Sequence, residues 1–185
     1  MSLFGSIVCY FCGRLELKRY AAYIFLDLDG VLNTVRNIAR LRANGKPLSD
    51  EFGYLFDAEA VANLQTIIEQ TGAEIVVSSS WKFEGLERMR QLWQARRLPG
   101  RLLDITPDYL GCIGEIDPSN PDTFVGKGNE IKAWLERQAA ADCRYVILDD
   151  TPDILVSQRP NFIQINDECG ITAADAKRAI EILIR

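Results

Sequence analysis

Histidine is absent from this chain of 185 residues. Its absence excludes Ser-His-Asp and Cys-His catalysis, histidine-ligated zinc sites, and proton transfer through an imidazole. An enzyme with this composition must work through carboxylates, lysine, hydroxyls or thiols. An aspartate nucleophile fits this restriction, because its carboxylate needs no separate base in the first step.

Long apolar runs and a regular cysteine pattern are also missing. No apolar stretch approaches the length of a membrane span, so we expect no membrane partner. The five cysteines are an odd number and do not indicate a disulfide framework; a metal or redox role for Cys9 and Cys12 is the weaker alternative. Reduced thiols predict a cytoplasmic protein.

The N-terminal segment is expected to stand apart from the rest of the chain. Residues 3–11 are apolar, but they lack a basic start and a convincing cleavage site. We therefore expect residues 1–20 to be loosely attached, with a degenerate signal or anchor as the alternative. Residues 21–185 are long enough to bury a substantial core as one domain.

The most informative feature that is present is a pair of aspartates, Asp27 and Asp29, at the end of the apolar run Ala22–Leu26. This run predicts a buried strand, and Gly30 allows the sharp bend that both carboxylates need to serve one site. Two like charges so close together call for a compensating cation or reacting group. A simple hairpin turn is the structural alternative. An EF-hand calcium loop is excluded, because apolar residues occupy three of its ligand-region positions: Val31, Leu32 and Ile38.

Three further features predict phosphate chemistry. The apolar segment Glu74–Val77 ends in Ser78, Ser79 and Ser80, whose hydroxyls and amides could cradle a phosphate. Lys127 stands at the start of a helical pattern, where a cation is unfavourable unless an anion is bound. The segment Tyr145–Leu148 ends in Asp149 and Asp150. Together these residues suit phosphoryl transfer with a divalent metal.

This ordered set resembles the haloacid-dehalogenase-like (HAD) phosphohydrolase superfamily, whose motifs are matched here by Asp27 and Asp29, Ser78, Lys127, and Asp149 with Asp150. The residues in and around the four motifs are similar to those of the small HAD domains associated with RNA-repair proteins. The resemblance implies that Asp27 is the nucleophile, forming an aspartyl-phosphate that water hydrolyses.

The resemblance also implies roles for the other motif residues. Asp29 would be the general acid and then the base, and its backbone carbonyl would bind the metal. Ser78 would hold a phosphoryl oxygen, and Lys127 would neutralise developing charge. The metal, expected to be Mg²⁺, would be bound at Asp27, Asp29 and Asp150, with Asp149 as a second-sphere or water-mediated ligand.

Three residues are candidate substrate contacts: Gly30, Ser79 and Arg36. Ser79 and Arg36 each have a structural alternative. Ser79 suits an ordinary turn. Arg36 belongs to a basic cluster with Arg40, Arg42 and Lys46, and a solvated basic face is the default interpretation of that cluster. The net charge of −5 gives no general affinity for nucleic acid, so any such contact would be local.

The alternation of elements predicts an α/β fold, a Rossmann-like three-layer α/β/α sandwich with a mainly parallel sheet. Besides the three strands, we expect a strand at 102–105 and another at 162–165. Helices are expected to start at Ala58 after an Asp57 N-cap, ending at Gly72, then near Phe83, at Gly128 and at Thr172, where Asp175 completes a capping box. Asp153 is expected to cap a turn from Ile154. Residues 33–56 are too few for a helical cap domain, so we expect a minimal cap or none and an open site.

The sequence thus predicts an Mg²⁺-dependent phosphohydrolase acting on a phosphorylated substrate, with a polynucleotide end favoured by the resemblance. A small-molecule phosphatase or phosphotransferase using the same residues is one alternative. A non-catalytic module that binds phosphate or metal is another, although it would have no need of the nucleophile. No obligate protein partner is inferred.

Overall fold

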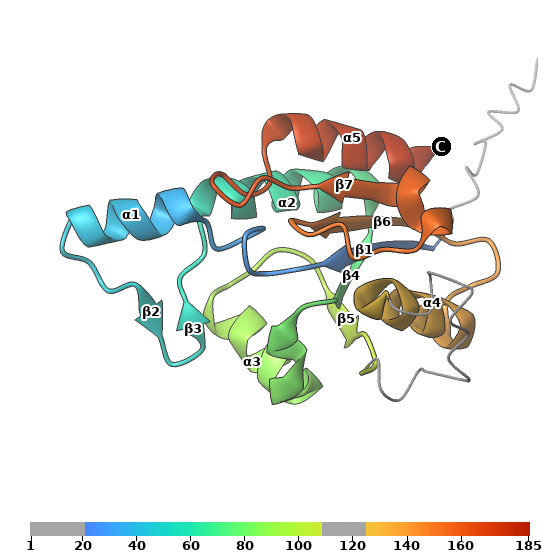
Figure 1. Cartoon of the computed structure of the whole chain (residues 1–185), viewed down its shortest axis with the longest axis horizontal. Helices are drawn as coiled ribbons and strands as arrows, with labels where there is room; N and C mark the ends of the chain where they lie inside the picture. The colour runs from blue at the N-terminus through green and yellow to red at the C-terminus, as the bar shows by residue number, and fades with distance from the viewer. Residues whose placement is uncertain (1–20, 109–124) are drawn as a thin grey trace, which may run out of the picture.

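The computed structural model describes residues 21–108 and 125–185 (Figure 1). The expected N-terminal segment, 1–20, with Cys9 and Cys12, lies outside the described residues. Within them, Cys143 and Cys169 are free thiols. None of the helices in this part of the chain is long and apolar enough to cross a membrane.

The core of the fold is a five-stranded parallel sheet. Its strands are β1 (Ala22–Leu26), β4 (Glu74–Val77), β5 (Leu102–Ile105), β6 (Arg144–Asp149) and β7 (Phe162–Gln164), in the order β5-β4-β1-β6-β7. All four neighbouring pairs are parallel. The first strand therefore lies in the centre, as expected for an apolar run buried on both faces.

Helices cover both faces of this sheet (Figure 1). Helices α2 (Ala58–Thr71) and α5 (Ala173–Ile184) lie on one face, and α3 (Leu86–Ala95) and α4 (Gly126–Gln138) lie on the other. Alternate residues of β1 serve the two sides: Ile24 and Leu26 belong to the larger apolar cluster, while Tyr23 and Phe25 pack with Trp134 of α4. The predicted three-layer α/β/α sandwich is confirmed.

Local signals place three helix boundaries where the sequence predicts them. Asp57 caps α2 by accepting the amide of Glu59, and the helix ends at Gly72 in the left-handed conformation. Thr172 and Asp175 form the predicted capping box of α5. Each of these signals acts within a few residues, which is why the sequence alone suffices for them.

Three local expectations need correction. Residues Ser80–Glu84 form a 3₁₀ helix, and α3 begins only at Leu86, because Gly85 adopts a positive φ of 86° that breaks the helix. Helix α4 begins at Gly126, two residues before the expected start. Asp153 does not cap a turn from Ile154: its carboxylate accepts the amide of Lys127 and so caps α4 from outside that helix.

Between β1 and α2 the chain forms helix α1 (Val35–Ala43) and a small hairpin of β2 (Ser49–Asp50) and β3 (Gly53–Tyr54). Figure 1 shows these elements projecting from one side of the sandwich. Arg96, the C-cap of α3, ties the hairpin to the body of the domain by binding both carboxylate oxygens of Asp50, which lowers the pKa of that carboxyl. The expected absence of a large cap between residues 33 and 56 agrees with this short insertion.

Candidate active site at the carboxyl edge of the sheet

The register of the sheet brings the motif residues into one row. Leu26 pairs with Val77 on one side and with Leu148 on the other. The residues that follow these three positions are Asp27, Ser78 and Asp149, so they stand side by side where the strands end. Two backbone bonds extend the ladder into the row: the amide of Asp27 donates to Leu148, and that of Ser78 to Leu26. Carboxyl ends of parallel strands are the usual location of sites in open α/β sheets.

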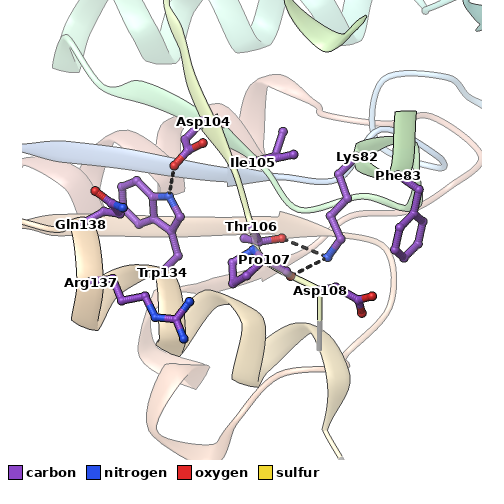
Figure 2. A pocket seen from close by; sticks show the side chains of 10 residues that line it. All are labelled: Lys82, Phe83, Asp104, Ile105, Thr106, Pro107, Asp108, Trp134, Arg137 and Gln138. Atoms are coloured by element: carbon purple, nitrogen blue, oxygen red, sulfur yellow. Dashed lines mark hydrogen bonds between the residues drawn. The ribbon is translucent and has the colours of Figure 1, made fainter. Parts of the chain in front are cut away.

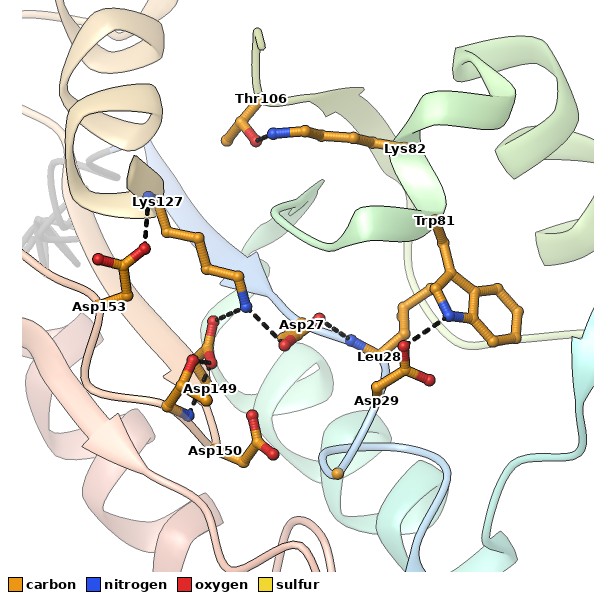
Figure 3. Close-up of polar contacts among 12 residues, drawn as sticks. Asp27, Leu28, Asp29, Trp81, Lys82, Thr106, Lys127, Asp149, Asp150 and Asp153 are labelled. Carbon is orange, nitrogen blue, oxygen red and sulfur yellow. Dashed lines mark hydrogen bonds and ion pairs between the residues drawn. The ribbon is translucent and has the colours of Figure 1, made fainter. Parts of the chain in front are cut away.

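Lys127 reaches this row from α4 (Figure 3). Its Nζ lies 2.6 Å from Oδ2 of Asp27 and 2.5 Å from Oδ2 of Asp149. Burial alone would lower the pKa of Lys127, but Asp27 and Asp149 outweigh burial and raise it. The ammonium is therefore held charged between two carboxylates, although 100 residues separate it from the first of them.

The start of α4 is stabilised by the loop after β6. Val125, at the N-cap position, has no side chain able to accept a backbone hydrogen bond. Asp153 replaces it by accepting the amide of Lys127 at 3.0 Å, and its backbone carbonyl accepts the amide of Gly128. The same loop thus carries the acidic pair and orients the helix that carries the lysine.

Three carboxylates converge at one point. Single oxygens of Asp27, Asp149 and Asp150 all lie within 4.8 Å of one another. Burial, and then the charge of Asp149, raise the pKa of Asp27; burial, and then the charge of Asp27, raise the pKa of Asp150. Such crowding is unfavourable for three anions near one lysine and is relieved by a divalent cation.

The donor set fits a hard cation such as Mg²⁺, which prefers carboxylate oxygens and retains waters. Both oxygens of Asp149 already accept hydrogen bonds, Oδ2 from Lys127 and Oδ1 from the amide and hydroxyl of Thr151. Asp150 has a different position, against the backbone of Gly30. A Cβ at Gly30, which has a φ of 70°, would lie 2.5 Å from Oδ2 of Asp150. Gly30 therefore leaves room for the Asp150 carboxylate beside the nucleophile loop.

Two serine hydroxyls at the end of β4 are buried without a hydrogen-bond partner within the described residues. They are the hydroxyls of Ser78 and Ser79. The Ser79 hydroxyl lies close enough to Asp27 to counteract slightly the rise in its pKa. Buried polar groups are normally satisfied, so two adjacent exceptions beside a carboxylate and an ammonium suit a ligand with acceptor oxygens. Ser80, by contrast, is exposed at the start of the 3₁₀ helix.

Asp29 does not join the three carboxylates; it is exposed and faces the opposite way. Its Oδ1 accepts a hydrogen bond from the side-chain amide of Asn33 at 2.6 Å. Its Oδ2 accepts one from the indole N–H of Trp81 at 2.9 Å (Figure 3). The bend after Asp27 therefore separates the two carboxylates. Metal binding by Asp29 could only be through its backbone carbonyl, and that role stays a prediction.

Arg36 is engaged away from the carboxylate cluster. It lies in the first turn of α1, and its guanidinium contacts Asp57 at 3.2 Å, Glu59 at 2.9 Å and the carbonyl of Cys169 at 3.4 Å. These contacts hold α1 against the start of α2. A substrate contact would require Arg36 to release them, so its role as a substrate ligand stays a prediction.

Sequence reasoning missed a buried group near the row. Lys82 contacts Glu130 of α4, the hydroxyl of Thr106 at 3.2 Å and the carbonyl of Pro107 at 3.1 Å. Figure 2 shows Lys82 directed at Thr106 in the wall of a cavity of about 360 Å³. A lysine in a 3₁₀ helix carries no sequence signal for burial, because lysine is usually solvated.

Comparison with known proteins agrees with this geometry. Residues 23–176 match the family model of the HAD domain in Swiss Army Knife RNA repair proteins. Searches of curated proteins and of solved structures gave no significant match. The match spans all the motif residues from Asp27 to Asp150 and supports a phosphohydrolase type of function. The chain therefore belongs to the family of HAD domains found in Swiss Army Knife RNA repair proteins.

Proposed function

We propose that this protein is an Mg²⁺-dependent phosphohydrolase that uses Asp27 as its nucleophile and acts on phosphorylated nucleic-acid ends. The observation that carries the proposal is the position of Lys127, whose ammonium bridges Asp27 and Asp149 beside two unpartnered serine hydroxyls. Anionic, cationic and donor groups at one strand edge are the components that phosphoryl transfer needs.

In the first step a carboxylate oxygen of Asp27 forms a bond to phosphorus while the bond from phosphorus to the leaving oxygen breaks. The hydroxyls of Ser78 and Ser79 donate hydrogen bonds to the phosphoryl oxygens, and Lys127 balances the negative charge that collects on these oxygens. A bound Mg²⁺, held by Asp27 and Asp150 with Asp149 behind them, would neutralise the carboxylates and the phosphate. In the second step water attacks the phosphorus of the aspartyl-phosphate, the bond from phosphorus to the Asp27 oxygen breaks, and inorganic phosphate leaves with Asp27 regenerated.

Asp29 handles the proton in both steps. Once protonated, its carboxyl would donate to the leaving oxygen and then accept a proton from the attacking water. The two hydrogen bonds from Asn33 and Trp81 keep this side chain out of the carboxylate cluster. To reach the leaving group, one Asp29 oxygen must give up its hydrogen bond from Asn33 or from Trp81. These two residues therefore fix the position of the Asp29 carboxyl before the reaction.

The proposed substrate class rests on two observations. The matched family is described by its occurrence in RNA repair proteins. In the described residues, the insertion between β1 and α2 consists of one helix and one short hairpin. An insertion of this size would leave the strand edge accessible to the end of a large phosphorylated molecule.

The test is phosphate release from 5′- and 3′-phosphorylated oligonucleotides, measured with Mg²⁺ and with a chelator. We expect turnover with Mg²⁺ that Asp27→Asn reduces at least about a thousandfold without loss of fold by circular dichroism. Asp142→Asn, at an exposed turn before β6, is the matched control and should keep full activity. Unchanged turnover in Asp27→Asn would refute the nucleophile, and turnover unaffected by the chelator would refute the metal.

A further inference from the structure

A second cavity opens beside Asp29. It has a volume of about 450 Å³, within the range of about 300–1,000 Å³ typical of ligand sites. One wall comes from the β2–β3 hairpin, with Phe52 and Tyr54, and the other from the segment after β4, with Trp81 and Arg88. We call this cavity the hairpin groove. Three of these four side chains are aromatic, and the Tyr54 side chain is half exposed.

Contacts from α3 and from its C-cap residue, Arg96, hold the hairpin in place. Arg96 binds Asp50 through two nitrogens and donates to the carbonyls of Gly53 and Tyr54 at 3.0 and 2.9 Å. Arg88 donates to the carbonyl of Glu51 at 2.7 Å. Four backbone or side-chain anchors on a two-stranded hairpin keep its aromatic residues in fixed positions, which lowers the entropic cost of binding.

The aromatic walls also fit each other closely. A Cβ at Gly53 would lie 2.8 Å from Cη2 of Trp81, so only glycine lets the hairpin backbone approach the indole ring. The Phe56 ring lies 5.7 Å from the Trp81 ring, and the guanidinium of Arg88 lies 4.1 Å from the centre of the Phe52 ring. The groove is therefore a preformed structure.

Asp29 connects the groove to the chemistry. It lies two residues after Asp27, its carboxylate lines the groove, and its Oδ2 is bound to Trp81. In the proposed reaction Asp29 donates its proton to the leaving oxygen, so the two atoms must be in contact. A group attached to that oxygen would therefore lie next to the groove.

The charged residues of the groove favour binding of a neutral ring and disfavour binding of a second phosphate group. Glu51 and Glu84 add two carboxylates to that of Asp29, while Arg88 is already engaged with a carbonyl and with Phe52. A phosphate chain would meet net negative charge here. A nucleobase carries no charge, stacks on aromatic side chains, and can donate from its exocyclic amine to a carboxylate.

We infer that the hairpin groove binds the nucleobase of the terminal nucleoside, the leaving group from which the phosphate is removed. The inference rests on the proposed function and adds the subsite that distinguishes a nucleotide from other phosphate esters. Phe52 and Tyr54 are then specificity residues, and they take no part in the chemical steps.

The experiment compares phosphorylated oligonucleotides that end in a normal or in an abasic nucleotide. We expect the wild-type kcat/KM to favour the normal end by about five- to hundredfold. Phe52→Ala and Tyr54→Ala should reduce this preference toward one by lowering kcat/KM for the normal end, while Tyr54→Phe should keep the preference. Phe83→Ala is the matched control, because Phe83 is 70% exposed and lines the other cavity.

The inference is overturned if the wild type hydrolyses the normal and the abasic end equally well. It is also overturned if the Phe52→Ala/Tyr54→Ala double variant still prefers the normal end. Binding of the same two oligonucleotides to Asp27→Asn gives a readout that does not depend on turnover. If no phosphate ester is hydrolysed, the proposed function fails, and a base-dependent affinity that is lost in the double variant would still support the groove. Equal affinities for the two oligonucleotides would overturn it.

Discussion

Lys82 and Glu130 form an ion pair in which the two side chains are only 6% and 8% exposed. Lys82 follows the serines of β4 by a few residues, and Glu130 lies one helical turn after Lys127 on α4. The pair therefore joins the segment that carries the Ser78 and Ser79 hydroxyls to the helix that carries the Lys127 ammonium. Thr106, next to Ser78 in the strand-edge row, donates a further contact to Glu130 at 3.4 Å.

Lys82→Met should strongly destabilise the protein, because it leaves the Glu130 carboxylate buried without its cation. We expect a loss of about 3–5 kcal/mol in the free energy of unfolding, measured with urea. Lys132→Met is the control, since Lys132 and Glu136 are 58% and 65% exposed and their ion pair should contribute less than about 1 kcal/mol. Equal losses in the two variants would contradict the structural role of Lys82.

Gly30→Ala should impair activity more than its effect on the backbone explains. The new Cβ would lie 2.5 Å from Oδ2 of Asp150 and displace that carboxylate. Gly45→Ala is a close match, with a φ of 60° against 70° and no atom within 4 Å of the added Cβ. Both substitutions should cost about 1–2 kcal/mol of stability for the left-handed backbone. Only Gly30→Ala should raise the Mg²⁺ concentration needed for half-maximal phosphate release. Similar kinetics in both variants would contradict the role of Gly30 in leaving room for the Asp150 carboxylate.

Asp27→Asn should increase stability at neutral pH when metal is removed. Burial, and then Asp149, raise the pKa of Asp27 above its ordinary value of 3.8. The folded state therefore binds the proton more tightly than the unfolded state. Protonated Asp27 therefore favours the folded state, and this contribution to stability is complete at pH values below the ordinary pKa. It is lost as the pH rises through the raised pKa of the folded state.

The measurement is the free energy of unfolding of metal-free protein from about pH 4 to about pH 8. The wild type should lose stability with rising pH more steeply than Asp27→Asn, which still leaves Asp149 to pair with Lys127. Added Mg²⁺ should stabilise the wild type by about 2.7 kcal/mol at a hundred times its Kd, and the variant by less. A metal-free variant less stable than the wild type at neutral pH would contradict the prediction.

Asp153→Ala should reduce both stability and turnover. It removes the acceptor of the Lys127 amide at the start of α4, at a cost of about 0.5–2 kcal/mol. The loosened first turn should also misplace the Lys127 ammonium and lower kcat. Thr172→Ala is the matched control: it removes the N-cap of α5, a helix that carries none of the candidate site residues. Its stability should fall by a similar amount while kcat stays unchanged, and an unchanged kcat in Asp153→Ala would show that α4 holds Lys127 by other contacts.

Much of the fold follows from local signals. The apolar run before Asp27 predicts the central strand, Asp57 and Gly72 predict both ends of α2, and Thr172 with Asp175 predicts the start of α5. The motif residues could also be found in the sequence, since each stands directly after an apolar strand or at a helix start. Their convergence follows from the parallel register, because neighbouring strands end at the same edge.

Other parts of the site depend on contacts between distant segments. The bond from Trp81 to Asp29 spans 52 positions, and the Asp153 cap reaches back 26 positions to Lys127. From the sequence, Asp153 is expected to be a local N-cap, because an Asp carboxylate often accepts the backbone amides two or three residues later in the chain. Here the nearest unsatisfied helix start belongs to α4, which only the folded chain places beside it.

The order and chemistry of the motif residues were determined by the sequence alone, because strand ends, helix starts and side-chain types are local properties of the chain. Tertiary structure decided how the carboxylates divide: Asp27, Asp149 and Asp150 lie together, with Lys127 bound to the first two. Asp29 instead is directed toward Trp81 and the hairpin groove. The physical reason is that a carboxylate follows the nearest hydrogen-bond donor or cation, and which donor is nearest is set by packing between elements far apart in the sequence.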